Sequence, residues 1–401
     1  MISIQEAKQI ILDATSPLPP IRVRLSEALN KILAIDIFSP LDLPPFPQSS
    51  MDGYAFAFED LHRVDGFEIK HKIAAGDETI YTIKSGETVR IFTGAPVPPG
   101  ADTVVMQEKT EIRDGRLYIL DTQINKGSNY RNKGSEINEG ALALAKGTKI
   151  GPAAIGFLAS MGIAEVDVYS IPSASILITG DELAKSGESL RHGQVYDSNS
   201  YTLISAFNQA GVEKIDIHFI PDQVDALRKT MSGALLKSDL LVLTGGVSVG
   251  DFDFVAQAAE SAGVQTVFHK IRQRPGKPMY FGVYNSQHNN EKGLKFVFGL
   301  PGNPASALTC FYEYIEPALK KMMGTESAIK ILNVPISGGY VKPAGLTHFL
   351  KAVYDGSIVT PLDAQESFRL KSFARANALI VIREDVTVVQ NGELVEIHVL
   401  P

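Results

Sequence analysis

Residues 240–251 read LLVLTGGVSVGD, and this stretch decides the fold class. A short apolar run that ends in a glycine-rich turn is typical of a buried strand leading into a helix. Residues 174–182, ASILITGDE, and residues 295–304, KFVFGLPGNP, follow the same order. We therefore predict that strands and helices alternate from residue 171 to 323 and form a mostly parallel sheet covered by helices on both faces.

The flanking regions have other patterns. A capping-box sequence at residues 3–6, SIQE, predicts a short N-terminal helix. From residue 54 to about 120, strand-like stretches such as 67–73 and 79–92 are separated by Gly, Asp and Asn turns, which indicates a compact β domain. Strand patterns return in residues 331–401, where we expect a small β-barrel or sandwich.

Composition excludes several classes of protein. The 401 residues include 38 Lys and Arg against 45 Asp and Glu, a net charge of −7, and this balance disfavours a nucleic-acid-binding protein. Cys310 is the only cysteine, so an intramolecular disulfide and a cysteine-rich metal site are excluded. The N-terminus lacks the pattern of a secretion signal, and no apolar stretch approaches the ~20 residues that cross a bilayer. We expect a cytoplasmic protein without a membrane partner.

Ligands of open α/β sheets gather beyond the carboxyl ends of the strands, so the loops after the strands are the first candidates for a site. Gly245 and Gly246 would let the backbone approach an anion closely, although a tight strand-to-helix turn explains them equally well. The stiff loop from Pro301 to Pro304 suits a preorganised binding surface, or it caps the next helix.

Carboxylates follow two of the predicted strands. Asp181 and Glu182 could hold a hard cation such as Mg²⁺, which prefers oxygen ligands, or they form a solvated turn. Asp222 opens a helix after a proline, where capping alone would explain it. Asp253 could merely complement a helix dipole.

Residues 270–278, KIRQRPGKP, place four cations in a short segment of an acidic protein. If this segment is a strand, Lys270, Arg272 and Arg274 share one face. Such a face suits a phosphate-bearing or oxyanion ligand, while the alternative is an edge strand protected by charge.

The N-terminal half carries three unusual strings: SSMDGYA at 49–55, FTGAPVPPGAD at 92–102 and NYRNKGSE at 129–136. No Ser-His-Asp, Cys-His or HExxH arrangement is present. We therefore expect chemistry by positioning, metal and anion stabilisation rather than by a covalent nucleophile.

Six motifs occur in an order that resembles the MoeA-type molybdopterin molybdenumtransferases, relatives of the plant Cnx and animal gephyrin E-domains. The motifs are SMDGYA at 50–55, TGA at 93–95, TGDEL at 179–183, GGVSVG at 245–250, PGKP at 275–278 and LPGNP at 300–304. The resemblance covers essentially the whole chain. It implies four domains: a discontinuous N-terminal domain of 1–43 and 134–170, an inserted β domain of 44–133, an α/β molybdopterin-nucleotide-binding domain of 171–323 and a C-terminal β-barrel of 324–401.

The resemblance also implies an activity and an assembly. Molybdenum from molybdate is inserted into adenylylated molybdopterin, and AMP is released with Mg²⁺. A homodimer is implied, with its site between the α/β domain of one subunit and the β domain of its partner. The upstream molybdopterin adenylyltransferase is a further implied partner.

Matching positions receive roles by the same resemblance. The implied catalytic residues are Asp52, Thr93, Glu182, Asp222 and Asp253. The implied nucleotide-binding residues are Gly245, Gly246, Ser248, Lys270, Arg274, Lys277, Pro301 and Pro304. Oxyanion binding is implied for Arg131, Lys351 and Ser372, and Mg²⁺ binding for Asp181, Glu182, Asp222 and Asp253.

Departures from the family pattern gather at the oxyanion-binding end. A relative that prefers tungstate to molybdate therefore remains an alternative. They are Ser135, Glu136, Arg274, Leu346, Glu366, Phe368 and Lys371. Two other readings compete with the enzyme. The adenylyltransferase one step earlier is small and lacks the strings around Asp52 and Thr93, and a gephyrin-type scaffold would carry a fused trimerising domain and a long linker.

Overall fold

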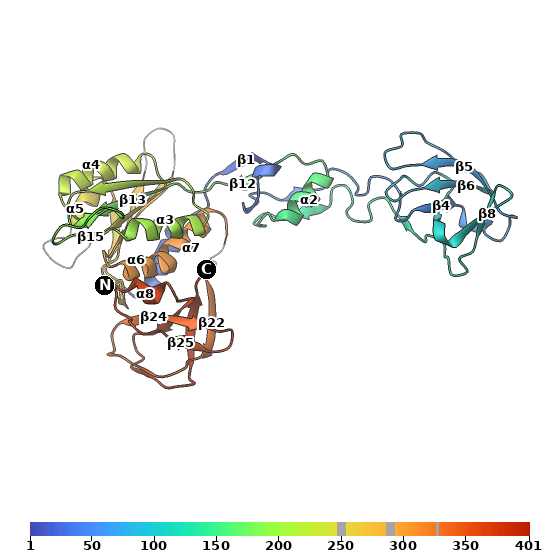
Figure 1. Ribbon diagram of the computed structural model, residues 1–401. Coiled ribbons are helices and arrows are strands. Elements are labelled where there is room, and N and C mark those ends of the chain that lie inside the picture. Colours follow the sequence, from blue (N-terminus) through green and yellow to red (C-terminus); the bar gives the residue numbers. More distant parts are fainter. Residues whose placement is uncertain (247–253, 286–292, 326–328) are drawn as a thin grey trace. The chain divides into compact units, whose positions relative to one another are not determined.

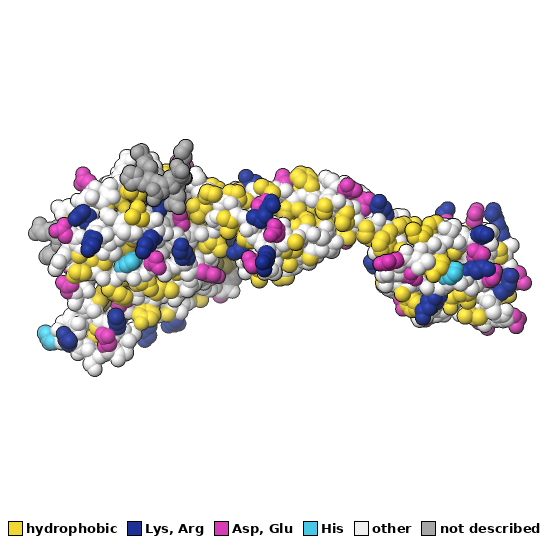
Figure 2. All heavy atoms as spheres, turned by 90° about the horizontal axis from the view of Figure 1, so that it is seen from above, with side chains coloured by type: hydrophobic (Ala, Val, Ile, Leu, Met, Phe, Trp, Pro, Cys, Tyr) yellow, Lys and Arg dark blue, Asp and Glu magenta, His cyan; other side chains and the backbone are white. Residues whose placement is uncertain are grey.

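The computed structural model describes residues 1–246, 254–285, 293–325 and 329–401 (Figure 1). The chain divides into two compact units. The larger unit joins Met1–Ile21 to Tyr169–Pro401, and the smaller unit is Arg22–Val168. On the face seen in Figure 2, basic and acidic side chains are interspersed rather than gathered by sign. None of the helices in the described ranges is long and apolar enough to cross a membrane.

A six-stranded sheet forms the centre of the larger unit. Its order is β16 (Ile215–Ile220), β13 (Ala174–Thr179), β17 (Leu240–Thr244), β21 (Leu294–Leu300), β20 (Tyr280–Asn285) and β18 (Gln265–His269). The first four strands are parallel, whereas β20 is antiparallel to both of its neighbours. The sheet is therefore mixed. The connections on either side of β20 are too short for the crossover that parallel pairing requires.

Helices cover both faces of this sheet, as the buried apolar strands predicted (Figure 1). One core contains side chains of α1 (Ile4–Ala14), α3 (Asn199–Gln209), α6 (Pro304–Cys310) and α7 (Glu316–Met322), and the other those of α4 (Val224–Leu235) and α5 (Phe254–Ser261). β17 serves both cores: Leu240 and Val242 belong to the first, and Leu241 and Leu243 to the second. This alternation explains why the strand is apolar throughout.

The predicted capping box is present at the start of α1. The Glu6 amide donates to Ser3 Oγ at 3.2 Å, and the Ser3 amide donates to Glu6 Oε2 at 2.7 Å. Ile4, Ala7 and Ile11 are buried in the core that α3, α6 and α7 share. The first 21 residues thus pack with the larger unit, while the domain of 1–43 and 134–170 that the family resemblance implies stays a prediction.

The C-terminal region is a half-barrel. Its sheet has the order β19 (Gln273–Arg274), β24 (Thr347–Tyr354), β26 (Ala378–Ile382), β28 (Leu394–Val399) and β22 (Lys330–Pro335), with β25 (Val359–Pro361) paired to β24. A β-bridge links Ile336, which follows β22, to Val359 of β25. A ribbon of β23 (Tyr340–Val341) with β27 (Val388–Val389) and the short helix α8 (Leu370–Phe373) complete it.

The smaller unit contains a six-stranded sheet of its own. Its order is β7 (Thr103–Met106), β4 (Gly53–Phe56), β6 (Glu87–Ile91), β5 (Phe67–Ile73), β9 (Arg116–Ile119) and β8 (Thr110–Arg113). The predicted strand at 67–73 is confirmed, but the one at 79–92 is wrong for residues 79–86, which form a loop. This loop leaves Ile80 84% exposed, so its β-branched residues do not mark a buried strand.

Apolar residues from 25–43 and from 137–168 share a separate core around α2 (Pro152–Ser160). Short ladders pair β1 (Pro20–Arg24) with β12 (Glu165–Tyr169), β2 (Ile37–Phe38) with β11 (Leu142–Leu144), β3 (Gln48–Ser49) with β10 (Tyr130–Arg131), and β14 (Leu183–Ala184) with β15 (Val195–Tyr196). Single helical turns lie at η1 (Leu25–Glu27), η2 (Phe58–Asp60) and η3 (Gln107–Lys109), and a π-helical turn at η4 (Phe311–Ile315).

Candidate functional site

Three loops of the larger unit meet at the carboxyl edge of its central sheet. The strands that carry them end in register, because Ile178 of β13 pairs with Thr244 of β17, and Thr244 pairs with Leu300 of β21. Thr179 Oγ1 donates to the Thr244 carbonyl at 3.3 Å and ties the first two strand ends together. The sequence prediction that these loops share an edge is confirmed.

Gly245 is packed directly against β13. A Cβ atom there would lie 2.6 Å from Thr179 Oγ1 and 2.7 Å from its carbonyl oxygen, and the residue has φ +84°, so only glycine fits. A Cβ on Gly302 would lie 3.7 Å from the Gly245 Cα atom, which places the loop of Pro301 to Pro304 beside the glycine turn. Backbone atoms therefore line this part of the edge. Ser248 lies outside the described residues.

The carboxylates after β13 and β16 are close enough to interact. The pKa of Asp222 is raised, first by partial desolvation of its carboxyl group and then by the negative charges of Asp181 and Glu182. Glu182 folds back over Gly180, where a Cβ would meet its carboxylate oxygen at 2.8 Å. Within the described ranges, no three Asp, Glu, His or Cys side chains are already arranged around a metal position. Asp253 lies outside those ranges.

The basic segment is not one continuous strand, so the prediction of a shared face is wrong. β18 ends at His269, Lys270 adopts φ +78°, and the two-residue strand β19 begins only at Gln273. Arg272 turns toward the C-terminal region, where its Nε lies 2.9 Å from Glu384 Oε2. The left-handed backbone at Lys270 breaks the alternation on which a common face depends.

Arg274 and Lys277 are exposed, and neither forms an ion pair with any residue that the structure describes. Arg274 lines a hollow of about 290 Å³ together with Tyr340 and His348. Burial lowers the pKa of His348 to about 4, and the positive charges of Lys342 and Arg274 act in the same direction. His348 is therefore neutral at physiological pH, and its Nδ1 lies 2.9 Å from Tyr340 Oη.

Lys351 and Ser372 both bind the backbone of the C-terminal region. The Lys351 ammonium donates to the carbonyls of Ala364, Glu366 and Arg369 at 2.8, 3.3 and 3.1 Å. Ser372 Oγ donates to the Ala364 carbonyl at 2.8 Å. Burial lowers the pKa of Lys351. Two of the three donors expected to bind an oxyanion, Lys351 and Ser372, are thus engaged with residues 364–369 in this structure.

The predicted residues of the smaller unit form two groups. Asp52 and Thr93 form two hydrogen bonds: Thr93 N and Thr93 Oγ1 each donate to Asp52 Oδ1 at 2.8 Å. Nearby, Arg90 Nη1 donates to the Gly53 carbonyl at 2.9 Å, and its guanidinium carbon lies 5.1 Å from the centre of the Tyr54 ring. The turn that carries Asp52 is therefore held on both sides.

Arg131 lies apart from these bonds, in β10, and lines a hollow of about 440 Å³ in the smaller unit. Pro44, Gln48, Ser135 and Glu136 also line it. A cation beside an open hollow is able to receive an anion, while Glu136 adds an opposing charge.

Sequence reasoning missed Asn199, the first residue of α3. Its Nδ2 donates to the Gly302 carbonyl at 2.8 Å, and its buried Oδ1 has no hydrogen-bond partner in the described part of the chain. Asn199 thus fixes the loop next to Gly245. The available signal was the string DSN at 197–199, because Asp, Ser and Asn are typical of the start of a helix.

Comparisons with known proteins place this architecture in a family. The MoeA N-terminal region (domain I and II) matches residues 2–162, a probable molybdopterin binding domain matches 175–321, and the MoeA C-terminal region (domain IV) matches 333–400. The molybdopterin biosynthesis MoeA protein from Pyrococcus horikoshii has a similar solved structure, with a TM-score of 0.86 at 28% identity over 100% of this chain and 99% of its own.

Two curated relatives carry the same name. The molybdopterin molybdenumtransferase of Haemophilus influenzae is 33% identical over 412 residues, which cover 99% of this chain and 98% of the relative. That of a Nostoc species is 34% identical over 393 residues, covering 94% and 88%. The fold thus defines a multidomain protein built around a molybdopterin-binding type of α/β domain. The chain belongs to the MoeA family.

Proposed function

We propose that this protein is a molybdopterin molybdenumtransferase, which moves molybdenum from molybdate to adenylylated molybdopterin and releases AMP. The carrying observation is the carboxyl edge of the central sheet, where Gly245 and Gly302 bring two backbone loops together beside Asp181, Glu182 and Asp222. This edge offers N–H groups to phosphate and carboxylates to a cation. The names of the family relatives support the transfer itself.

The nucleotide end of the substrate binds at this edge. Gly245 and Gly246 approach the phosphates with their backbone, and the loop from Pro301 to Pro304 covers them. Arg274 and Lys277, which have no acidic partners among the described residues, supply positive charge, and Lys270 with Ser248 completes the set.

The residues at the edge fit Mg²⁺ by their chemistry, because Asp181, Glu182 and Asp222 are neighbouring carboxylates, and the charges of the first two add to the desolvation that raises the pKa of Asp222. Asp181 and Glu182, with Asp253, would hold the ion, which neutralises phosphate charge when bound. Asp222, with its raised pKa, accepts a proton from the attacking water. The water oxygen bonds to phosphorus as the phosphoanhydride bond breaks and AMP leaves.

The remaining site residues act from a second subunit of a homodimer. Asp52 and Thr93 lie in the smaller unit, where Thr93 keeps the Asp52 carboxylate ionised and fixed. We assign to them the reacting end of the substrate bound by the partner, and to Arg131 an oxyanion contact. Adenylylated substrate must come from an adenylyl-transfer reaction, so the enzyme of that step is the expected partner.

Incubation of the purified protein with adenylylated molybdopterin, Mg²⁺ and molybdate tests this function. AMP release that requires molybdate, with molybdenum recovered on the pterin dithiolene, is expected. Asp222→Asn removes the proton acceptor and should reduce the rate about 100-fold or more, whereas Asp225→Asn, on the exposed first turn of α4, should not. AMP release that is independent of both molybdate and Asp222 would refute the proposal.

A further inference from the structure

The loop that carries Arg274 and Lys277 rests on a buried polar cluster. Gln273 Nε2 donates to the Pro275 carbonyl at 3.0 Å and to Cys310 Sγ at 3.4 Å. Gln273 Oε1 accepts a hydrogen bond from the Tyr314 hydroxyl. Cys310 Sγ in turn lies 3.9 Å from the Gly276 carbonyl. The side chains of Gln273 and Cys310 therefore contact two successive carbonyls of the loop, those of Pro275 and Gly276.

The seat of the loop is close-fitting. A Cβ atom on Gly276 would lie 2.5 Å from Gln273 Nε2 and 2.6 Å from Cys310 Sγ, and the residue has φ +94°. Only glycine allows the backbone to approach the cluster this closely. Any displacement of Gln273 or Cys310 therefore reaches the loop directly.

The cluster is buried and its polar groups are paired. Gln273 and Cys310 are fully buried, and Tyr314 is 1% exposed. Both hydrogens of the Gln273 amide group and its oxygen have partners. Burial raises the pKa of Cys310 to about 12, so its thiol remains a donor at neutral pH. Apolar side chains would fill the same volume without the desolvation cost, so the cluster contributes a defined loop position rather than stability alone.

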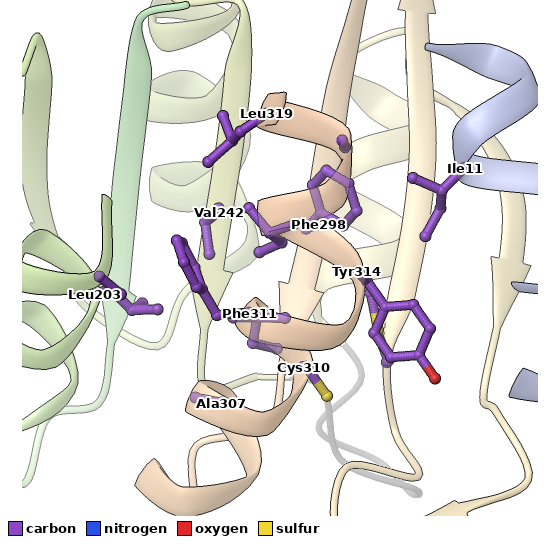
Figure 3. Close-up of a cluster of buried hydrophobic side chains, with 14 of the residues drawn as sticks. Ile11, Leu203, Val242, Phe298, Ala307, Cys310, Phe311, Tyr314 and Leu319 are labelled. Carbon is purple, nitrogen blue, oxygen red and sulfur yellow. The ribbon is translucent and has the colours of Figure 1, made fainter. Parts of the chain in front are cut away.

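A π-helical turn brings the tyrosine into the cluster. The turn spans Phe311–Ile315, and Figure 3 shows Cys310 and Tyr314 projecting from the same side of the helix. Such turns are uncommon and often occur at functional sites. The same turn is anchored elsewhere, because the buried carboxylate of Glu313 contacts Lys8 Nζ at 2.5 Å and His398 Nδ1 at 2.7 Å.

We propose that Tyr314 and Gln273 are positioning residues that hold the loop of Pro275 to Lys277, and with it the Arg274 and Lys277 cations, in the geometry that binds the phosphates of the substrate. This inference rests on the proposed function, because it assumes that these two cations bind the nucleotide end. Neither residue touches the substrate.

Tyr314→Phe tests the inference, because it removes one hydroxyl and keeps the ring in the core. We expect the Kd for adenylylated molybdopterin to rise about tenfold, with kcat at saturation changed less than threefold. Amide hydrogen exchange of Gly276, Lys277 and Met279 in the free protein should become faster. Tyr312→Phe is the matched control, because its hydroxyl contacts Gln209, away from the cluster, and it should leave both quantities unchanged.

A double-mutant cycle separates positioning from general destabilisation. Gln273→Met should raise Kd at least as much as Tyr314→Phe does, because it also removes the bonds to the Pro275 carbonyl and to Cys310 Sγ. Adding Tyr314→Phe to Gln273→Met should raise Kd no further, because the Tyr314 hydroxyl then has no Gln273 oxygen to bind. If Tyr314→Phe shows the same Kd and the same amide exchange rates as the wild type, the inference is overturned and the proposed function stays intact. Absence of nucleotide binding by the wild type would instead refute the proposed function, whereas the exchange measurement would still report on the loop.

Discussion

Thr93 donates two hydrogen bonds to a single oxygen of Asp52, from its amide nitrogen and from its hydroxyl, both at 2.8 Å. These bonds lower the pKa of Asp52, the amide bond contributing most. The carboxylate is therefore ionised at neutral pH and held in one orientation. A fixed, exposed charge of this kind suits a residue that acts on a ligand.

Asp52→Asn should abolish most of the turnover without unfolding the smaller unit. The substitution keeps the shape of the side chain but removes its charge, and a loss of about 100-fold or more is expected when a fixed charge at the reacting end of the substrate is removed. Molybdate-dependent AMP release measures the effect. Asp121→Asn, which breaks an ion pair with Lys109 in the same unit, is the control and should retain full activity. Wild-type turnover in Asp52→Asn would exclude this residue from the site.

Charge removal at Arg274 or Lys277 should weaken nucleotide binding in a salt-dependent manner. Attraction between an exposed cation and a phosphate is screened as ionic strength rises, so the variants Arg274→Gln and Lys277→Gln should lose both affinity and part of the salt dependence. Titration of the substrate between low and moderate salt measures this. Arg272→Gln removes the contacts with Glu384 and with the Met1 carbonyl, and it should bind the substrate as the wild type does. Equal losses in all three variants would indicate a nonspecific effect of net charge.

His348 should make stability depend on pH. Its pKa is lowered to about 4 in the folded protein, while in the unfolded chain it is near its ordinary value of 6.5. The unfolded state therefore binds more protons between these values, and the contribution to stability is complete above pH 6.5 and lost as pH falls toward 4. Between pH 7 and pH 5 the loss is about 2 kcal/mol.

Denaturation of the wild type and His348→Gln at both pH values isolates this contribution. The variant lacks the titrating ring, so its free energy of unfolding should fall by about 2 kcal/mol less than that of the wild type between pH 7 and pH 5. Parallel losses in the two proteins would show that His348 is not the titrating group.

Lys351 and Ser372 should act first on stability. Lys351→Met removes three hydrogen bonds to backbone carbonyls in residues 364–369, which should cost about 3 kcal/mol, and Ser372→Ala should cost about 1 kcal/mol. Thermal unfolding measures both changes. If these residues instead bind molybdate, the KM for molybdate will rise in the variants while the melting temperature stays constant.

The sequence was most informative where a single segment decides its own structure. The run Leu240–Leu243 predicted a strand buried on both faces, because four consecutive apolar residues leave no polar face, and the observed strand extends one residue further to Thr244. The loops after β13, β17 and β21 could be assigned to one edge because the alternation of strands and helices predicted parallel strands, whose carboxyl ends lie at the same edge of a sheet. Gly245 indicated either a close backbone approach to an anion or a tight turn, and the structure shows that the residue packs against Thr179.

Contacts between distant segments could not be predicted in this way. β19 pairs with Thr347 and His348, which no local pattern of the basic segment indicates. Lys351 was expected to bind an oxyanion, and nothing in the sequence around it shows that the Ala364, Glu366 and Arg369 carbonyls would accept hydrogen bonds from its ammonium group. Gln273 lies between two basic residues in the sequence, and its burial against Tyr314 depends on a helix that begins 31 residues later.

The most direct test of the account is a crystal structure of the protein with adenylylated molybdopterin and Mg²⁺. We predict phosphate density within hydrogen-bond distance of the Gly245 and Gly246 amides, with Arg274 or Lys277 on its other side. Nucleotide density at any place other than the carboxyl ends of β13, β17 and β21, at full occupancy, would contradict it.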